Sequence, residues 1–231
     1  MSNVAIITAR GGSKRIPKKN IKLFRGKPII CYSIEVALES RLFDYIMVST
    51  DDLEIAEIAK KAGAKVPFLR SQKNADDFST TADVMTEVLY ELKKIHETFT
   101  NACCIYPTAP FITQQILKEA HEKLISNSFD TVFPVCQFSY PIYRALEINR
   151  NKIQMIWPEN LNKRSQDLSP AYHDAGQFYW LNINSFLKES KLLTTNSSSL
   201  ILDEMQVQDI DTETDWKIAE LKHTLLFPNN D

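Results

Sequence analysis

Short runs of apolar residues alternate along this chain with longer stretches in which apolar positions recur about every three or four residues. The short runs predict buried strands at residues 4–8, 43–49, 102–106 and 131–136. The longer stretches predict helices after Pro28, at residues 52–62, at residues 81–97 and after Thr113. This alternation is typical of a doubly wound α/β domain, in which helices cover both faces of a mostly parallel sheet.

Weaker apolar patterns complete this body. They predict further strands at residues 66–69, 178–183 and 207–210, and a final helix at residues 214–221.

The middle of the chain follows a different pattern. Helical periodicity fades over residues 137–175, and residues 144–158 predict a β-hairpin that turns near Asn149. We therefore expect a single domain over residues 1–231 with a small β-containing insertion at 137–175. This insertion is predicted to be either a lid or a subunit contact.

Composition argues against several classes of protein. A length of 231 residues suits one generous domain, and a net charge of −2 argues against bulk electrostatic binding to nucleic acid. The apolar run at residues 4–7 is too short for a membrane span or a signal-peptide core, so we expect a cytoplasmic protein without a membrane partner. The 4 cysteines lack C-x-x-C spacing, which favours buried, reduced thiols over zinc or disulfide roles.

A basic loop follows the first predicted strand. Residues 10–20 read R-G-G-S-K-R-I-P-K-K-N and contain five cationic side chains. The two glycines let the backbone approach an anion closely, and a bound polyanion would offset the repulsion among the cations. Neither G-x-G-x-x-G nor G-x-x-x-x-G-K-[ST] occurs in the chain. The loop is therefore either a polyphosphate site of another kind or a solvated basic turn.

This loop is one of several motifs that resemble a known family. The segment A-R-G-G-S-K-R-I-P-K-K-N, which starts at Ala9, resembles the signature of the cytidylyltransferases that activate nonulosonic acids. These are the CMP-sialate synthetases and their pseudaminate and legionaminate relatives. Further segments agree in sequence order: S-T-D-D at 49–52, Arg70 with A-D-D-F-S at 75–79, Y-P-T-A-P at 106–110, and D-I-D-T-E-T-D at 209–215. The resemblance covers most of the chain and implies a Rossmann-like nucleotidyltransferase fold.

The resemblance implies an enzyme that binds CTP with Mg²⁺. Arg10 and Lys19 would be catalytic, because they would stabilise charge on the phosphates. Asp209 and Asp211 would hold the metal, since carboxylates two residues apart on a strand share one face. Asp215 is a weaker candidate that would support these two ligands without contacting the metal itself. A charged turn before a helix is the alternative for these acids. The implied nucleotide-binding residues are Arg10, Gly11, Gly12, Ser13, Lys14, Lys19, Asn20, Arg70 and Ser79.

The second substrate implied by the resemblance is a nine-carbon acidic sugar, whose anomeric hydroxyl would receive CMP from CTP with release of pyrophosphate. CMP-sialate synthetases usually carry Gln at the position of Tyr106, and they differ from the segment Y-H-D-A-G-Q-F-Y-W at 172–180. Both features resemble the pseudaminate branch, although Pro107 stands where that branch often has Ala. We expect pseudaminic acid as the substrate, with legionaminic and N-acetylneuraminic acids as alternatives. The implied sugar-binding residues are Tyr106, Thr108, His173, Asp174, Gln177 and Tyr179.

Two other functions stay open at this point. Asp209 and Asp211 also satisfy the D-x-D metal motif of sugar-nucleotide glycosyltransferases, although the motif would lie unusually late in the chain. A non-catalytic nucleotide-binding module is the third alternative. Relatives of the resembled family are typically dimers, so we expect a homodimer and place its contact at residues 137–175.

Overall fold

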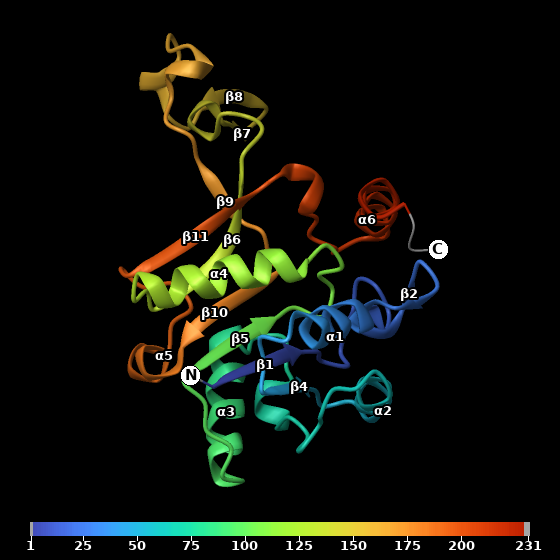
Figure 1. The fold of residues 1–231 in the computed structure, drawn as a ribbon. Helices are drawn as coiled ribbons and strands as arrows, with labels where there is room; N and C mark the ends of the chain where they lie inside the picture. The colour runs from blue at the N-terminus through green and yellow to red at the C-terminus, as the bar shows by residue number, and fades with distance from the viewer. Residues whose placement is uncertain (1, 229–231) are drawn as a thin grey trace.

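A seven-stranded mixed sheet forms the centre of the computed structural model, which describes residues 2–228 (Figure 1). Strands β10 and β9 run antiparallel to their neighbours, whereas β4, β1 and β5 are mutually parallel and β11 is parallel to β6. The predicted α/β fold with a mostly parallel sheet is confirmed. The order across the sheet is β11 (Ser197–Leu202), β6 (Thr131–Gln137), β10 (Phe178–Asn182), β5 (Asn101–Ile105), β1 (Asn3–Thr8) and β4 (Tyr45–Ser49), and β9 (Tyr172–Asp174) pairs with β6.

Both faces of the sheet are covered by helices. In β1, Ala5 and Ile7 are fully buried on the face that packs against α1 (Ile29–Ser40), α2 (Leu53–Lys61) and α4 (Gln114–Ser126). Val4 and Ile6 are fully buried on the opposite face, against α3 (Thr81–Lys94) and α5 (Ile183–Glu189). Because successive side chains of a strand point to opposite faces, the apolar run that predicted β1 supplies two hydrophobic cores.

Polar residues start the helices where the sequence predicts them. The Asp52 side chain accepts hydrogen bonds from the first amides of α2, and the Thr113 hydroxyl caps α4. Thr80 forms a capping box with Asp83 at the start of α3. The last helix, α6 (Glu213–Leu226), starts with a second capping box and packs through Trp216 on the small hairpin of β2 (Leu23–Phe24) and β3 (Lys27–Pro28).

Two predicted strands are wrong. Residues 66–69 form no strand, because only Lys65 bridges to β4 and Pro67 has no amide hydrogen to extend the pairing. Residues 207–210 lie in a loop, and the strand in this region is β11, which precedes them. The three serines at the start of β11 hide it from a search for apolar runs, and its pairing with β6 defines it instead.

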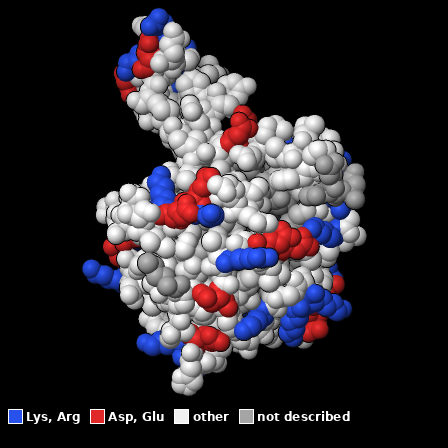
Figure 2. All heavy atoms as spheres, in the orientation of Figure 1, with Lys and Arg blue, Asp and Glu red and all other residues white. Residues whose placement is uncertain are grey.

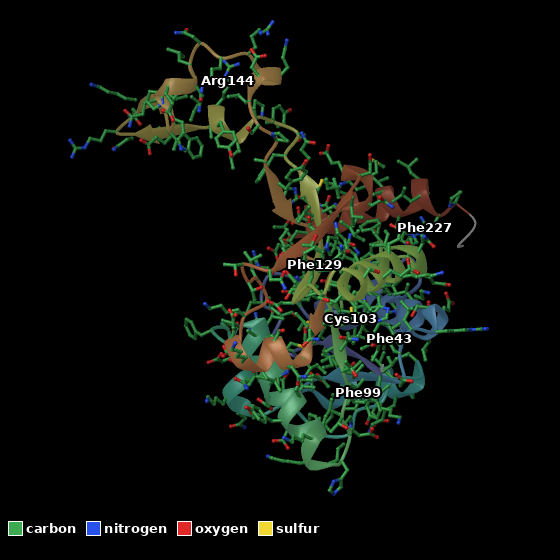
Figure 3. The ribbon with its side chains drawn as sticks, turned by 60° about the vertical axis from the view of Figure 1, so that its left-hand side comes forward. Phe43, Phe99, Cys103, Phe129, Arg144 and Phe227 are labelled. Carbon is green, nitrogen blue, oxygen red and sulfur yellow. The ribbon has the colours of Figure 1, made fainter. Side chains whose placement is uncertain are left out.

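A hairpin of β7 (Leu146–Asn149) and β8 (Lys152–Met155) stands away from the body (Figures 1 and 2). Its turn residues Arg150 and Asn151 have φ values of 48° and 62°, which matches the right-handed twist of a two-residue hairpin. The predicted hairpin is therefore confirmed. Figure 3 shows Arg144 on this protrusion, far from Cys103 in the sheet and from Phe227 after α6.

The remaining expectations concern thiols and membranes. Cys103, Cys104 and Cys136 are buried free thiols, as predicted, and Cys31 is a free thiol that is only partly buried. Within residues 2–228, the structure contains no helix with the length and apolar character that a bilayer crossing requires.

Candidate active site

A cavity of about 320 Å³ opens where β1, β4 and β5 reach their carboxyl ends. In open α/β sheets this edge is the usual position of a ligand. The loop after β1, the segment from Arg70 to Thr81 and the turn after β5 form its walls. Its lining includes nine of the predicted site residues: Arg10, Ser13, Lys14, Lys19, Asn20, Arg70, Ser79, Tyr106 and Thr108.

The two glycines of the basic loop have different surroundings. The Gly11 amide donates a hydrogen bond to the Asp51 carboxylate, with an N···O distance of 3.0 Å. A Cβ atom on Gly11 would lie 2.8 Å from Oδ2 of Asp52, so this close approach requires glycine. Gly12 is exposed and would meet no neighbour within 4 Å. Gly11 therefore packs the loop against the end of β4, and its amide is already engaged by Asp51.

Asn20 fixes the other end of the loop. Its side chain is buried, and its Nδ2 atom donates to the Arg10 carbonyl oxygen at 2.8 Å. Asn20 therefore has a structural role, because this bond holds Arg10 at the cavity wall, and its contact with phosphate stays a prediction.

Two cations of the loop, Arg10 and Lys14, contact the acidic segment at residues 76–77. Arg10 Nη1 donates to the Asp76 carbonyl oxygen and to Asp77 Oδ1, both at 2.8 Å, and Lys14 also pairs with Asp77. Hydrogen bonding to Lys14 is the main reason that the pKa of the Asp77 carboxyl is lowered.

Two further loop cations, Arg15 and Lys19, face the acidic segment near the end of the chain, whereas Lys18 pairs with Glu54. Lys19 Nζ lies 2.6 Å from the Ile210 carbonyl oxygen and 3.5 Å from Asp211 Oδ1, and Arg15 pairs with Asp211 at 2.8 Å. The basic loop is therefore held between the segment at 76–77 and the segment at 210–211.

Arg70 and Ser79, the two residues predicted to contact cytosine, occupy opposite ends of one cavity wall. Arg70 is only 7% exposed, and its guanidinium donates to the side chain and carbonyl of Ser49. Burial lowers the Arg70 pKa. The Ser79 hydroxyl donates to the Lys73 carbonyl oxygen and lies 2.7 Å from Asp76 Oδ1. Both side chains are therefore held in place by hydrogen bonds within the protein.

The predicted metal ligands Asp209 and Asp211 lie beside Lys19, in a loop and not on the strand that the sequence predicted. Loss of hydration and the nearby Asp211 charge raise the Asp209 pKa. The two carboxylates thus repel one another, and a divalent cation would offset that repulsion. Asp215 has another role, because its carboxylate accepts hydrogen bonds from Thr212 and the Asp211 amide in the α6 capping box.

The carboxylate oxygens of Asp209 and Asp211 are ligands of the kind that Mg²⁺ binds. No group of three or more His, Cys, Asp or Glu side chains within residues 2–228 is arranged to hold a metal. Protein sites for Mg²⁺ commonly use one or two carboxylates together with substrate phosphates and water. Asp209 and Asp211 fit that pattern, beside a loop of cations suited to phosphate.

Three of the predicted sugar residues, Tyr106, Tyr179 and Asp174, contact one another in sequence, and Tyr106 reaches the cavity. Tyr106 lines the cavity, and its hydroxyl lies 3.0 Å from Thr81 Oγ1 at the start of α3. The ring centroid of Tyr179 is 5.6 Å from that of Tyr106, and the Tyr179 hydroxyl donates to Asp174 Oδ2 at 2.6 Å. Burial raises the pKa of Tyr179. Thr108 also lines the cavity.

Four of the predicted sugar residues do not line the cavity: His173, Asp174, Gln177 and Tyr179. Gln177 is buried, its Nε2 atom donates to the Gln206 carbonyl oxygen at 2.6 Å, and its own carbonyl accepts the Tyr106 amide at 2.8 Å. The His173 ring packs edge-on against Phe138, with centroids 5.0 Å apart. In this structure Gln177 therefore positions Tyr106, and His173 belongs to the base of the protrusion.

Sequence reasoning missed several lining residues. Asn74 and Thr81 were not assigned, although both lie near Ser79 in the chain, and Thr81 directly follows the cap of a predicted helix. Thr8 and Val84 also line the cavity. These residues could have been expected at the cavity only because they lie near other predicted site residues in the chain, since their side chains are not of a type that indicates a binding site.

The cationic loop after the first strand of an α/β sheet, with carboxylates facing it, agrees with what the family comparison identifies, a nucleotidyltransferase. Residues 4–216 match the family model described as cytidylyltransferase. The chain belongs to the cytidylyltransferase family, and the resemblance noted in its motifs is confirmed.

Named relatives and solved structures agree with this assignment. The chain is 44% identical over 222 residues to the pseudaminic acid cytidylyltransferase of Campylobacter jejuni, with 96% of each chain covered. It is 30% identical to the CMP-N,N'-diacetyllegionaminic acid synthase of Legionella pneumophila, with 95% of each chain covered. A structure of CMP:2-keto-3-deoxy-manno-octonic acid synthetase complexed with CTP shares the fold, with a TM-score of 0.72, 15% identity and coverage of 98% of this chain and 100% of the other.

Proposed function

We propose that this enzyme transfers CMP from CTP to the anomeric hydroxyl of pseudaminic acid and releases pyrophosphate. One observation carries the proposal: Lys19 joins the basic loop to the Asp209–Asp211 segment at the edge of a cavity whose wall includes Tyr106. Cations that could neutralise phosphate charge thus lie at the same cavity as Tyr106, a candidate contact for the acceptor sugar. Family membership favours this reaction over glycosyl transfer and over a non-catalytic role.

The nucleotide half of the site rests on the basic loop. Arg10, Lys14 and Lys19 would contact the triphosphate, and Arg70 and Ser79 would lie against the cytosine. Phosphoryl chemistry requires mainly positioning and neutralisation of charge, and cations held at a cavity wall supply both. Arg10 and Lys19 have the catalytic role in this proposal, because their positive charges would stabilise the negative charge that develops when pyrophosphate leaves.

Asp209 and Asp211 would hold Mg²⁺. The bound cation would neutralise phosphate charge and help align the α-phosphate with the attacking hydroxyl. The contact between Lys19 and the Ile210 carbonyl holds these acids at the loop. The metal ligands and the triphosphate ligands would therefore be positioned together.

The acceptor half of the site would use Tyr106, Thr108 and Tyr179. Asp174 would orient the Tyr179 hydroxyl, and Gln177 would hold the backbone of Tyr106. The relatives named for pseudaminic acid are 44% and 40% identical to this chain, compared with 30% for the legionaminic acid relative and 33% for an N-acylneuraminate relative. This difference supports pseudaminic acid as the acceptor.

The protrusion would form a homodimer contact. In β7 and β8, the paired residues Ile148 and Ile153 are 76% and 65% exposed, and Leu146 lies on the same face at 56%. A continuous apolar face on an exposed hairpin is typical of a protein contact. Much of the protrusion visible in Figure 2 is also free of charged side chains below its outer end. A second copy of the chain would cover this face.

A direct assay tests the reaction. The purified enzyme is incubated with CTP, Mg²⁺ and, in parallel, pseudaminic, legionaminic or N-acetylneuraminic acid, and pyrophosphate is measured. We expect release that depends on both CTP and sugar, with the highest kcat/KM for pseudaminic acid. A higher kcat/KM for either other acid would correct the acceptor but keep the cytidylyl transfer. A lack of pyrophosphate with all three acids would contradict the proposed reaction.

A further inference from the structure

The segment from Arg70 to Thr81 is attached firmly at its beginning. Glu87 of α3 accepts hydrogen bonds from the Ser71 amide at 2.8 Å and the Ser71 hydroxyl at 2.7 Å, and it also contacts Asn74. The Arg70 amide bonds to the Thr50 carbonyl oxygen at 2.8 Å. One end of the segment is therefore fixed to both α3 and the end of β4.

The outer part of this segment, residues 76–79, is held in a different way. Within residues 2–228, its long-range hydrogen bonds and ion pairs are those with Arg10, which bonds to Asp76 and Asp77, and with Lys14, which pairs with Asp77. The paired side chains are solvent-accessible, with exposures of 38% for Arg10, 77% for Lys14 and 38% for Asp77. Ion pairs this exposed contribute little to stability and are readily exchanged for another anion. Phe78, at the outermost position, is 91% exposed and contributes little packing.

The partners of Asp77 are the cations that the proposed function assigns to the triphosphate. A single carboxylate carries one negative charge, whereas a nucleoside triphosphate carries several and offers many more acceptor oxygens. Because both anions are attracted to the same two cations, Arg10 and Lys14, they compete for these side chains. The multivalent anion has the stronger attraction in this competition.

We infer that Asp77 is an affinity-setting residue of the nucleotide site: its carboxylate occupies the Arg10 and Lys14 donors until the triphosphate displaces it and releases residues 76–79. The inference rests on the proposed function, since it takes these cations to be triphosphate ligands. Ser79, on the same segment, is a proposed cytosine contact. Displacement of Asp77 therefore couples occupation of the phosphate site to the position of the base-recognition segment.

A charge-matched pair of variants tests this competition. Asp77→Asn removes the negative charge from Arg10 and Lys14 and keeps the shape of the side chain. Glu54→Gln is the control, because Glu54 pairs with Lys18, a cation of the same loop that does not line the cavity. Binding of inorganic triphosphate and of CTP to each full-length protein is measured by calorimetry without acceptor sugar.

We expect Asp77→Asn to bind both ligands about threefold to tenfold more tightly than Glu54→Gln, the range expected when two exposed ion pairs no longer compete. Equal affinities of the two variants, or weaker binding by Asp77→Asn, would overturn the inference while leaving the proposed reaction intact. If the wild-type protein binds neither ligand, the basic loop is not the triphosphate site, and both proposals fail. Melting temperatures of the variants verify that each is folded.

A second measurement follows the segment itself. Phe78→Trp places a fluorophore at the exposed position next to Asp77, and the wild-type tryptophan signal is subtracted. We expect inorganic triphosphate to shift the emission of the introduced indole, and Asp77→Asn in this background to show the shifted emission before ligand is added. Emission that stays unchanged on triphosphate binding would overturn the displacement of the segment.

Discussion

The Nζ atom of Lys19 lies 2.6 Å from the carbonyl oxygen of Ile210, a residue 191 positions later in the chain. Ile210 is itself only 1% exposed and packs with Phe24 and Trp216 in the core beneath α6. The side chain of Lys19 thus joins the basic loop to a segment that is anchored by burial. This contact places Asp209 and Asp211 beside the cations, although neither acid belongs to the central sheet.

Loss of Lys19 is expected to affect catalysis strongly. Lys19→Ala removes a cation from the proposed triphosphate site and the donor to Ile210. We expect kcat to fall by about 10²–10³, by comparison with loss of a single transition-state donor. The control is Lys18→Ala, because Lys18 is 67% exposed and pairs with Glu54 outside the cavity. Steady-state kinetics with CTP and pseudaminic acid measure both, and near-normal turnover of Lys19→Ala would contradict its catalytic role.

The metal assignment is tested through the dependence of turnover on Mg²⁺. Asp211→Asn is expected to raise the Mg²⁺ concentration for half-maximal turnover by about tenfold or more, because one of two carboxylate ligands is lost. Glu213→Gln is the matched control, since Glu213 is 58% exposed and pairs with Lys22. An unchanged Mg²⁺ titration for a folded Asp211→Asn protein would place the metal elsewhere.

Asp209 is expected to reduce the stability of the metal-free enzyme. Its pKa is raised, by loss of hydration and by Asp211, so the folded state favours the neutral carboxyl. This contribution to stability is present below the ordinary pKa of aspartate and is lost as pH rises through the folded-state pKa. Asp209→Asn should therefore increase the melting temperature slightly at neutral pH in the presence of a chelator. The increase should vanish at strongly acidic pH, and a lower melting temperature at neutral pH would refute this account.

The protrusion is expected to control the oligomeric state. Ile148→Asp places a charge in the middle of the exposed apolar face of β7 and β8 and should convert dimers to monomers. Lys152→Glu is the control, because its register position places it on the other face of the hairpin. Sedimentation velocity at several concentrations distinguishes these outcomes. A wild-type protein that is monomeric throughout this range would remove the proposed contact.

Acid sensitivity is expected to originate partly in α6. His223 is 2% exposed among aromatic rings, and burial, together with Arg25 and Lys27, lowers its pKa from 6.5 to about 4. Its contribution to stability is complete above the unfolded-state pKa and is lost as pH falls through about 4. The loss amounts to about 3 kcal/mol. In urea unfolding between neutral and acidic pH, His223→Phe should show a shallower decline than the wild type, and parallel curves would contradict this role.

The alternation of strands and helices was predictable because buried parallel strands need apolar side chains on both faces. The run at residues 4–8 and the cap at Thr113 are examples in which local pattern and final structure agree. β11 was not predictable in this way, since Ser197 begins an edge strand that is defined by its partner β6. The apolar pattern within one segment does not reveal which distant strand that segment pairs with.

The candidate site, like the fold, could be predicted from the sequence only in part. The basic loop could be recognised from residues 10–20 because its charges are contiguous in the chain. The partners of those charges could not, because Asp77 and Ile210 approach the loop only in the folded protein. Gln177 was expected at the sugar on account of its polarity, and nothing in the sequence indicated that its amide bonds to the carbonyl of Gln206.

The reversed direction of β10 has a consequence for how acceptor choice can change. Because β10 runs against β5, with Phe178 opposite Ile105, the turn that precedes β10 lies at the same sheet edge as the cation loop that follows β1. Residues 172–180 therefore bring Asp174 and Tyr179 beside Tyr106 in one contiguous stretch. None of the cations assigned to the triphosphate lies within that stretch. We therefore expect that exchange of this segment between relatives changes the acceptor that is used and leaves the nucleotide-binding loop in place, so that donor and acceptor specificity could evolve separately.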